Sequence, residues 1–188
     1  IVPIFKNSEQ LEKISEVVND LQTKLRKKGI SVKFDDRDTQ SPGWKFAEYE
    51  LKGVPVRLAI GPRDLENGTV EVARRDTKEK EVLSLIDIET KIPHLLEAIQ
   101  NNIYQKALDF RDQNIHTANT WDEFMDLIEN RGGFVAAHWD GTTETEIKIK
   151  ELSKATIRCI PLNNKLEEGT CILTGKASSQ RVLFAKAY

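Results

Sequence analysis

Few side chains in this 188-residue sequence have the types and spacing that catalysis requires. The phosphate-binding pattern G-x-x-x-x-G-K-[ST], the nucleophile pattern G-x-S-x-G and the zinc-protease pattern H-E-x-x-H are all absent. His94, His116 and His138 lie too far apart in the sequence to form a metal-ligand spacing. The sequence therefore indicates a binding role rather than a catalytic one.

Two segments contain side chains that favour binding chemistry. The acidic run 35–38 resembles a metal-binding stretch, but Arg37 within it and its place after an expected strand favour a turn with paired or solvated charges. Trp44, Phe46 and Tyr49 follow on a short expected helix, where their rings have the chemistry to stack on bases. Packing of the same rings on a sheet explains the pattern equally well.

Composition limits the kind of partner. Hydrophobic residues make up 39% of the chain and charged residues 31%, which is typical of a globular protein that dissolves in water. The formal net charge is −2, so any contact with nucleic acid is expected to be local and specific rather than a broad basic surface. No apolar run approaches the roughly 18 residues of a membrane span, and we expect no membrane partner.

The ends of the sequence and its cysteines bear on the cellular compartment of the protein. It has no signal peptide and no initiating Met, which favours a piece of a longer cytoplasmic protein. Cys159 and Cys171 are expected to be buried free thiols in a reducing compartment, with a disulfide between them as the alternative.

Residues 1–100 are expected to form an α/β domain. Asn7 and Gln10 form a capping pair, and the apolar residues that follow recur at spacings of three and four, which predicts an amphipathic helix. Asn67-Gly68 predicts a tight hairpin turn. These signals predict a mixed five-stranded sheet flanked by helices, with its first two strands parallel. The expected strands are 1–5, 30–34, 54–60, 69–75 and 81–85, and the expected helices cover 11–25, 44–51 and 92–110.

Residues 101–188 are expected to form a small α+β domain. Thr120 and Glu123 form a capping box that starts a helix ending at Gly132. The remaining expected elements are strands at 134–138, 155–160, 170–173 and 182–185 and a helix at 144–151.

A resemblance to a known family covers nearly the whole chain. Residues 41–80, SPGWKFAEYELKGVPVRLAIGPRDLENGTVEVARRDTKEK, resemble the anticodon-binding domain of class II aminoacyl-tRNA synthetases. The stretch GWKFAEYELKGVPVRLAIGPRDL is most similar to the prolyl enzymes of the archaeal and eukaryotic type. The segments ATIRCIPL, EEGTCILTGKAS and VLFAKAY resemble the extra C-terminal domain of the same enzymes.

The resemblance implies that the chain binds the anticodon of proline tRNA, which ends in two guanines. An unstacked guanine presents N–H donors that suit carboxylates and O6 and N7 acceptors that suit Arg or Lys. The family's anticodon-binding positions fall on Glu50, Arg57, Arg63, Asp64 and Lys80, with Lys78 an alternative to Lys80.

Ordinary structural roles are the alternative for these residues. Glu50 has the spacing to pair with Lys45 or Lys52 on its own helix, and Arg63-Asp64 has the composition of a simple turn.

The same resemblance bears on zinc. Many relatives bind zinc through four cysteines, and these positions fall here on Asp140, Thr145, Cys171 and Thr174. One thiolate, one carboxylate and two threonines make a poor tetrahedral site, so we expect no zinc. The resemblance also implies that the carboxylate of Tyr188 reaches towards the catalytic domain's active site.

For the whole protein, the resemblance implies a proline–tRNA ligase that uses ATP and magnesium in a catalytic domain joined in cis. Such enzymes are homodimers through that domain, so this chain alone is expected to be monomeric and inactive. One rival is a freestanding regulatory or adaptor paralogue that does not aminoacylate. The other, a small-molecule-binding α/β module, is disfavoured because no Gly-rich phosphate loop occurs.

Overall fold

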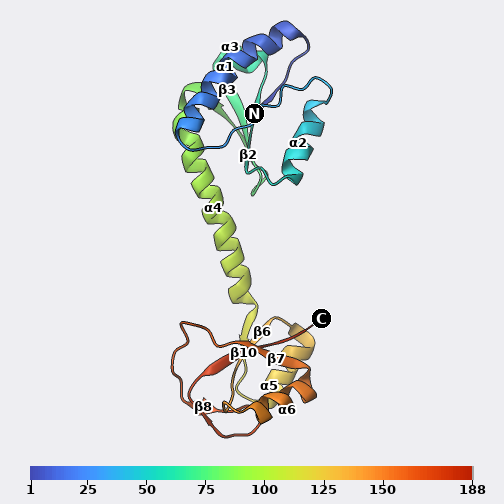
Figure 1. Ribbon diagram of the computed structural model, residues 1–188, viewed down its shortest axis with the longest axis vertical. Helices are drawn as coiled ribbons and strands as arrows, with labels where there is room; N and C mark the ends of the chain where they lie inside the picture. Colours follow the sequence, from blue (N-terminus) through green and yellow to red (C-terminus); the bar gives the residue numbers. More distant parts are fainter. Residues whose placement is uncertain (188) are drawn as a thin grey trace. The chain divides into compact units, whose positions relative to one another are not determined.

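The computed structural model describes residues 1–187 and divides the chain into two compact units, Ile1–Gln105 and Lys106–Tyr188 (Figure 1). The sequence places the domain boundary at residue 100 and the structure places it after Gln105, both within the same helix. The expectation for the Tyr188 carboxylate lies outside the described residues. Within residues 1–187, no helix has the length and apolar character that crossing a membrane requires.

The first unit is a mixed sheet with helices on both faces, as the α/β prediction states. Its strand order is β1-β2-β3-β4, with β1 parallel to β2 and the other neighbours antiparallel. Figure 1 shows α1 and α4 on one side of the sheet and α2 on the other. The elements are β1 (Val2–Pro3), α1 (Ser8–Lys27), α2 (Pro42–Leu51), β2 (Val56–Ile60), α3 (Pro62–Asn67), β3 (Thr69–Arg74), β4 (Lys80–Ser84), the 3-10 turn η1 (Leu85–Asp87) and α4 (Ile88–Gln113).

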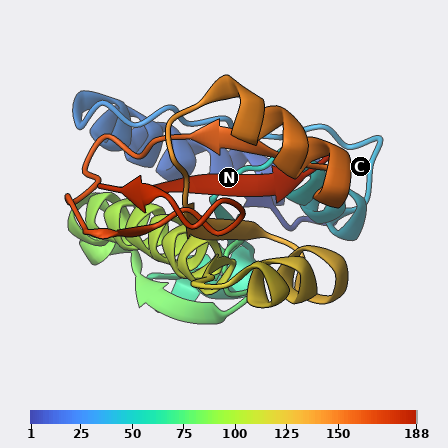
Figure 2. The same cartoon turned by 90° about the horizontal axis from the view of Figure 1, so that it is seen from below.

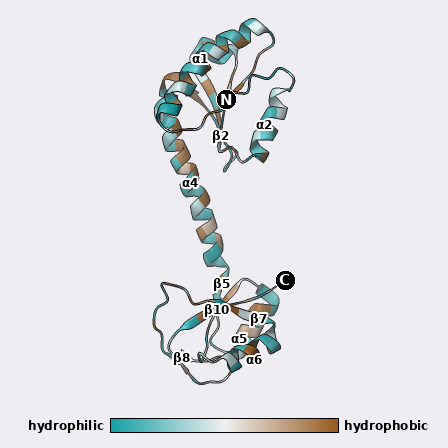
Figure 3. Ribbon diagram, viewed as in Figure 1, coloured by the Kyte–Doolittle hydropathy of each residue, from teal (hydrophilic) through white to brown (hydrophobic). Residues whose placement is uncertain are grey.

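Helix α1 forms as the sequence predicts. The Asn7 side chain accepts from the Gln10 backbone N–H at 2.9 Å, and Gln10 Oε1 accepts from the Lys6 backbone N–H at 2.8 Å. These contacts satisfy two donors at the start of the helix. The helix is amphipathic (Figure 3) and buries one apolar stripe against the sheet: Ile14, Val18, Leu21 and Leu25.

Strand alternation gives the sheet two different faces. Leu58, Val70, Val72 and Leu83 point towards α1 and α4 and form the core with them. The residues between them point the opposite way, towards α2. We call this surface the α2 face and define it by Arg57, Glu71, Ala73 and Lys80.

The prediction of a fifth strand at residues 30–34 is wrong. The start of the chain reaches this segment through Ile1: its amine donates to Lys33 O at 2.6 Å, and its carbonyl accepts from the Asp35 N–H at 3.0 Å. Other bonds of the segment go to α1, where Ile30 N donates to Leu25 O and Val32 O accepts from Arg26. Pro3 is the next residue of β1 on that side, and it has no backbone N–H to continue the ladder. The segment is therefore extended but unpaired along most of its length.

The prediction of a hairpin turn at Asn67-Gly68 is also wrong, because helix α3 precedes Gly68. Pro62 is its first residue, and the Asp64 carboxylate accepts from the Gly61 N–H at 2.8 Å. Gly68 has a φ of 64° and ends the helix in the left-handed conformation that glycine tolerates. Asn67-Gly68 therefore forms the end of helix α3 rather than a two-residue hairpin turn.

The second unit is a small α+β domain, as predicted. Its main sheet has the order β5-β6-β10-β7, and Figure 2 shows β10 in the middle of it. Phe124 and Phe184 are fully buried in its core with their rings edge to face. The elements are β5 (Ile115–Thr117), α5 (Trp121–Asp126), the π-helical turn η2 (Leu127–Arg131), β6 (Phe134–His138), α6 (Thr143–Ser153), β7 (Ala155–Cys159), β8 (Gly169–Thr170), β9 (Ala177–Ser178) and β10 (Arg181–Lys186).

Two expectations for the second unit need correction. The strand expected at 170–173 exists only as the short pair of β8 with β9, because residues 171–175 form a tight turn in which Gly175 N donates to Cys171 O. Both cysteines are free and Cys171 is buried, but Cys159 is exposed at the end of β7.

Candidate nucleic-acid interface

Arg57 is the central residue of the α2 face. It lies on β2, and its guanidinium is stacked 3.5 Å above the centre of the Phe46 ring on α2. Its side chain is only 12% exposed, and Nη2 donates to Glu71 Oε1 at 3.3 Å. Nη1 is buried and has no hydrogen-bond partner among the described residues. Burial lowers the pKa of Arg57, while Glu71 and Glu50 act to raise it.

Lys80 lies on the same face, two strands away. Its Nζ is 3.6 Å from Glu71 Oε1, the oxygen that also accepts from Arg57. The structure therefore brings Lys80 and Arg57 together through Glu71. Sequence reasoning missed Glu71, although its position two residues before Ala73 on β3 places it on this face.

Glu50 lies at the end of α2, at the edge of the α2 face. It accepts from Lys78 Nζ at 2.9 Å, and this contact lowers the pKa of Glu50. The Glu50 carbonyl accepts from Arg75 Nε at 2.8 Å, which holds the end of the helix. Lys78, the alternative to Lys80, thus contacts Glu50, whereas Lys80 is linked to Arg57 through Glu71.

The predicted alternative partners of Glu50 are wrong. Lys52 pairs with Glu48 one turn earlier on α2, and Lys45 is buried beneath the helix. Because Glu50 and Lys78 are both more than half exposed, water screens their ion pair, and either residue can easily exchange it for another partner.

A shallow pocket of about 20 Å³ joins the predicted residues on α2 and β2. Glu50 and Arg57 line it together, so an acceptor and a donor lie side by side around one opening. The full lining is Phe46, Tyr49, Glu50, Val54, Arg57, Ala73, Arg74 and Arg75.

Arg63 and Asp64 lie apart from this pocket, in the first turn of α3. Asp64 caps the helix through its bond to the Gly61 N–H, and Arg63 is exposed beside it. Neither residue lines the pocket. The structure therefore gives Asp64 a local folding role and leaves Arg63 as a surface cation.

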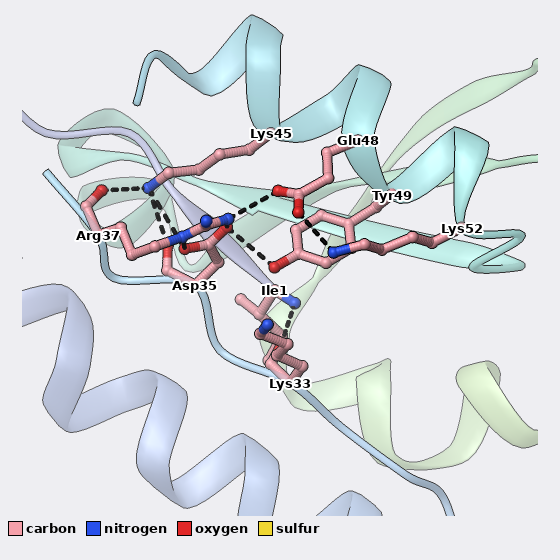
Figure 4. Close-up of polar contacts among 8 residues, drawn as sticks. All are labelled: Ile1, Lys33, Asp35, Arg37, Lys45, Glu48, Tyr49 and Lys52. Atoms are coloured by element: carbon pink, nitrogen blue, oxygen red, sulfur yellow. Dashed lines mark hydrogen bonds and ion pairs between the residues drawn. The ribbon is translucent and has the colours of Figure 1, made fainter. Parts of the chain in front are cut away.

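Helix α2, which positions Phe46 and Glu50, is tied to the chain before it by a buried polar network (Figure 4). Asp35 is 2% exposed and accepts two bonds of 2.7 Å from Arg37 and one of 2.9 Å from the Tyr49 hydroxyl. Lys45, 1% exposed, donates to the backbone carbonyls of Asp35 and Arg37. The Arg37 bonds above all hold the pKa of Asp35 well below its usual value.

This network bears on two open readings of the sequence. The acidic run lies outside the helices and strands and carries a paired charge, since Asp35 binds Arg37, which also bonds Glu48 at 2.7 Å. The three aromatic rings have different environments: Tyr49 is buried, Phe46 lies under Arg57, and Trp44 remains 46% exposed. The Arg37 guanidinium is 5.5 Å from the Trp44 ring centre.

In the second unit, three of the four positions expected from zinc-binding relatives come together. Thr145 and Thr174 each donate from Oγ1 to Asp140 Oδ2 at 2.9 Å, and Thr142 donates to Oδ1 at the same distance. Burial acts to raise the pKa of Asp140, but the bonds from Thr142 and Thr145 outweigh it and the pKa is lowered. Cys171 is buried at the start of the turn that also contains Thr174.

This donor set does not fit zinc. Structural zinc takes thiolate and imidazole ligands, whereas here the hydroxyls donate to the only carboxylate. Within residues 1–187, no three His, Cys, Asp or Glu side chains are grouped so that they could hold a metal ion.

Comparison with known proteins assigns both units. A family model described as the anticodon binding domain matches residues 1–95, and one described as prolyl-tRNA synthetase, C-terminal, matches residues 121–188. The chain is 60% identical over 188 residues to a proline–tRNA ligase of Flavobacterium johnsoniae and 58% identical to one of Porphyromonas gingivalis. Each match covers the whole of this chain but only 38% of the length of the relative.

A solved structure gives the same assignment. The crystal structure of prolyl-tRNA synthetase from Cryptosporidium parvum, complexed with L-proline and AMP, matches with a TM-score of 0.91 and 33% identity. The match covers 100% of this chain and 40% of that one. The resemblance found in the sequence is confirmed: the chain belongs to the prolyl-tRNA synthetase family, of which it carries the anticodon-binding domain and the C-terminal domain.

Proposed function

We propose that the α2 face binds the anticodon of proline tRNA and distinguishes its two guanines from other bases. The observation that carries this proposal is the buried Nη1 of Arg57, which has no hydrogen-bond partner within residues 1–187, beside the exposed carboxylate of Glu50. A buried N–H without an acceptor costs the unbound protein free energy, which a guanine O6 or N7 would remove. Glu50 has the acceptors that the guanine N1–H and amino group need.

Arg57 and Lys80 are proposed as the donors to guanine acceptors, and Glu50 as the acceptor. Because Glu50 is held only by an exposed ion pair with Lys78, a guanine can share or replace that contact at little cost. Arg63 is proposed to act as a more distant cation, and Asp64 to orient it through the helix cap. The stacked Arg57 and Phe46 offer a flat surface next to the base.

For the whole protein, the proposed activity is ligation of proline to its tRNA with ATP and magnesium in a catalytic domain joined in cis. The relatives that match this chain over its full length are proline–tRNA ligases, which favours this function over a freestanding adaptor paralogue. We propose that the complete protein is a cytoplasmic homodimer and that this chain alone is monomeric and does not aminoacylate. The adaptor alternative predicts tRNA binding that ignores the anticodon.

Replacing Arg57 by Ala is expected to weaken binding of a proline tRNA transcript by about five- to 150-fold, since a good contact to a base edge contributes about 1–3 kcal/mol. The measurement is a binding titration at fixed salt, run beside transcripts in which either anticodon guanine is replaced by adenine. Lys13→Ala, which removes the same charge from α1 on the opposite side of the sheet, is the matched control and should leave binding within about two-fold. A wild-type chain that binds all three transcripts equally would contradict the proposal.

We also propose that residues 101–188 fold without zinc, the Asp140 cluster taking the place of a metal. Elemental analysis of the purified chain is expected to find far less than one zinc per molecule, and a chelator should leave its melting temperature unchanged. Stoichiometric zinc that survives dialysis would overturn this proposal.

A further inference from the structure

Glu71 occupies a position between the two cations of the α2 face. In the register of the sheet, Arg57 on β2 and Lys80 on β4 both lie opposite Ala73 of β3. Glu71 is two residues from Ala73 on the same strand and therefore points to the same side. The short side chain of Ala73 leaves the space between the cations open, and the carboxylate of Glu71 reaches into it diagonally.

The contacts of Glu71 converge on a single atom. Its Oε1 lies 3.3 Å from Arg57 Nη2 and 3.6 Å from Lys80 Nζ, and its side chain is 34% exposed. Two cations on adjacent parts of a sheet repel each other, and one carboxylate oxygen between them offsets this repulsion. Arg57 is fixed from two sides, by Glu71 at Nη2 and by the ring of Phe46 on its face, and its buried Nη1 has no hydrogen-bond partner among the described residues.

The charge of this cluster matters as much as its geometry. Arg57 and Lys80 without Glu71 would form a strongly cationic pair, which attracts backbone phosphate regardless of sequence. With Glu71 included, the three side chains carry one net positive charge. The Glu71 carboxylate repels phosphate, while the N–H donors of Arg57 and Lys80 that do not face Glu71 remain able to bond a neutral base edge. The cluster thereby favours contacts that carry sequence information.

We propose that Glu71 is a positioning and specificity-determining residue of the α2 face. It sets the direction of Arg57 and Lys80 and biases them towards guanine acceptors rather than phosphate. This inference rests on the proposed function and extends it to a residue that does not itself contact the base.

The test is Glu71→Gln, which keeps the size of the side chain and removes its charge. Discrimination between the guanine-containing transcript and its adenine-substituted versions is expected to fall by about ten-fold, because the donors lose their fixed direction. The slope of log K against log salt should become steeper by about one, since one more cation is free to bind phosphate. Glu81→Gln is the matched control: it removes the same charge from β4, and Glu81 points to the opposite side of the sheet from Lys80.

A second measurement separates this inference from the function on which it rests. NMR of the chain without tRNA is expected to show restricted rotation of the Arg57 guanidinium in the wild type. In Glu71→Gln, the same guanidinium is expected to rotate faster. Unchanged rotation, or unchanged discrimination and salt slope, would overturn the role of Glu71. If the wild-type chain binds the guanine and adenine transcripts equally well, the proposed function is overturned, and the specificity role of Glu71 with it. The NMR result still decides whether Glu71 positions Arg57.

Discussion

Replacing Asp35 by Asn is expected to lower the free energy of unfolding of the first unit by about 3–5 kcal/mol. The substitution leaves Lys45 buried 3.8 Å from a neutral amide and removes the charge that Arg37 binds with two hydrogen bonds. Removing the charge of Asp35 leaves the buried Lys45 desolvated without its counter-charge, which is why the effect is large. Urea unfolding, followed by circular dichroism and by the fluorescence of Trp44, measures it.

The neighbouring carboxylate provides the control. Asp36 is exposed, so Asp36→Asn is expected to change stability by less than about 0.5 kcal/mol. Equal stabilities of the two variants would show that the Asp35 network contributes little. Because α2 carries Phe46 and Glu50, a loosened network should also weaken tRNA binding in Asp35→Asn.

The same network makes the stability of the first unit depend on pH. Arg37, then Tyr49 and Lys45, lower the pKa of Asp35 below its value in the unfolded chain. A carboxyl with a depressed pKa stabilises the fold above the unfolded value, near pH 4, and this contribution is lost as the pH falls below it. The difference in stability between the wild type and Asp35→Asn is therefore expected to shrink in acid.

Phe184→Ala is expected to destabilise the second unit by about 3–5 kcal/mol, the usual cost of removing a fully buried ring. Phe184 is 0% exposed, and its ring lies 5.2 Å from that of Phe124 at an angle of 81°. The substitution removes this edge-to-face contact and leaves a cavity at the centre of the sheet, between β6 and β7. Thermal unfolding followed by the fluorescence of Trp121, which stacks on Phe124, measures the effect.

Leu183 is the matched position on the same strand. It is half-buried on the other side of β10, so Leu183→Ala should cost only about 1 kcal/mol. If the two variants were equally stable, the core of the second unit would not be centred on the aromatic pair.

The sequence predicted the elements whose signals are local. The capping residues Asn7 and Thr120 and the regular apolar spacing placed the main helices correctly, because these interactions lie within one or two turns of the chain. The strand predicted at residues 30–34 failed because its outcome depends on residues elsewhere. Residues 30–34 have the composition of a strand, but the ladder stops because its partner segment has a proline at position 3.

The candidate site divides in the same way. The resemblance identified Arg57 and Lys80, which the structure places on the α2 face, and Glu50, which lies at its edge, but it could not reveal Glu71 as the link between Arg57 and Lys80. That link is created by the register of three strands, which no local pattern encodes. The burial of Lys45 was hidden for a similar reason, since its partners are backbone carbonyls of residues 35 and 37.

The buried Nη1 of Arg57 has no hydrogen-bond partner in the part of the chain that the structure describes, so the proposed recognition of guanine and the stability of the fold make opposite demands on this residue. A buried donor without an acceptor lowers the stability of the unbound fold by about 1–3 kcal/mol. An apolar side chain on the ring of Phe46 would remove this cost, and the resulting protein would be more stable but would lack the donor that the proposed guanine contact needs. Under the proposed function, the arginine at this position therefore serves binding at a cost in folding stability.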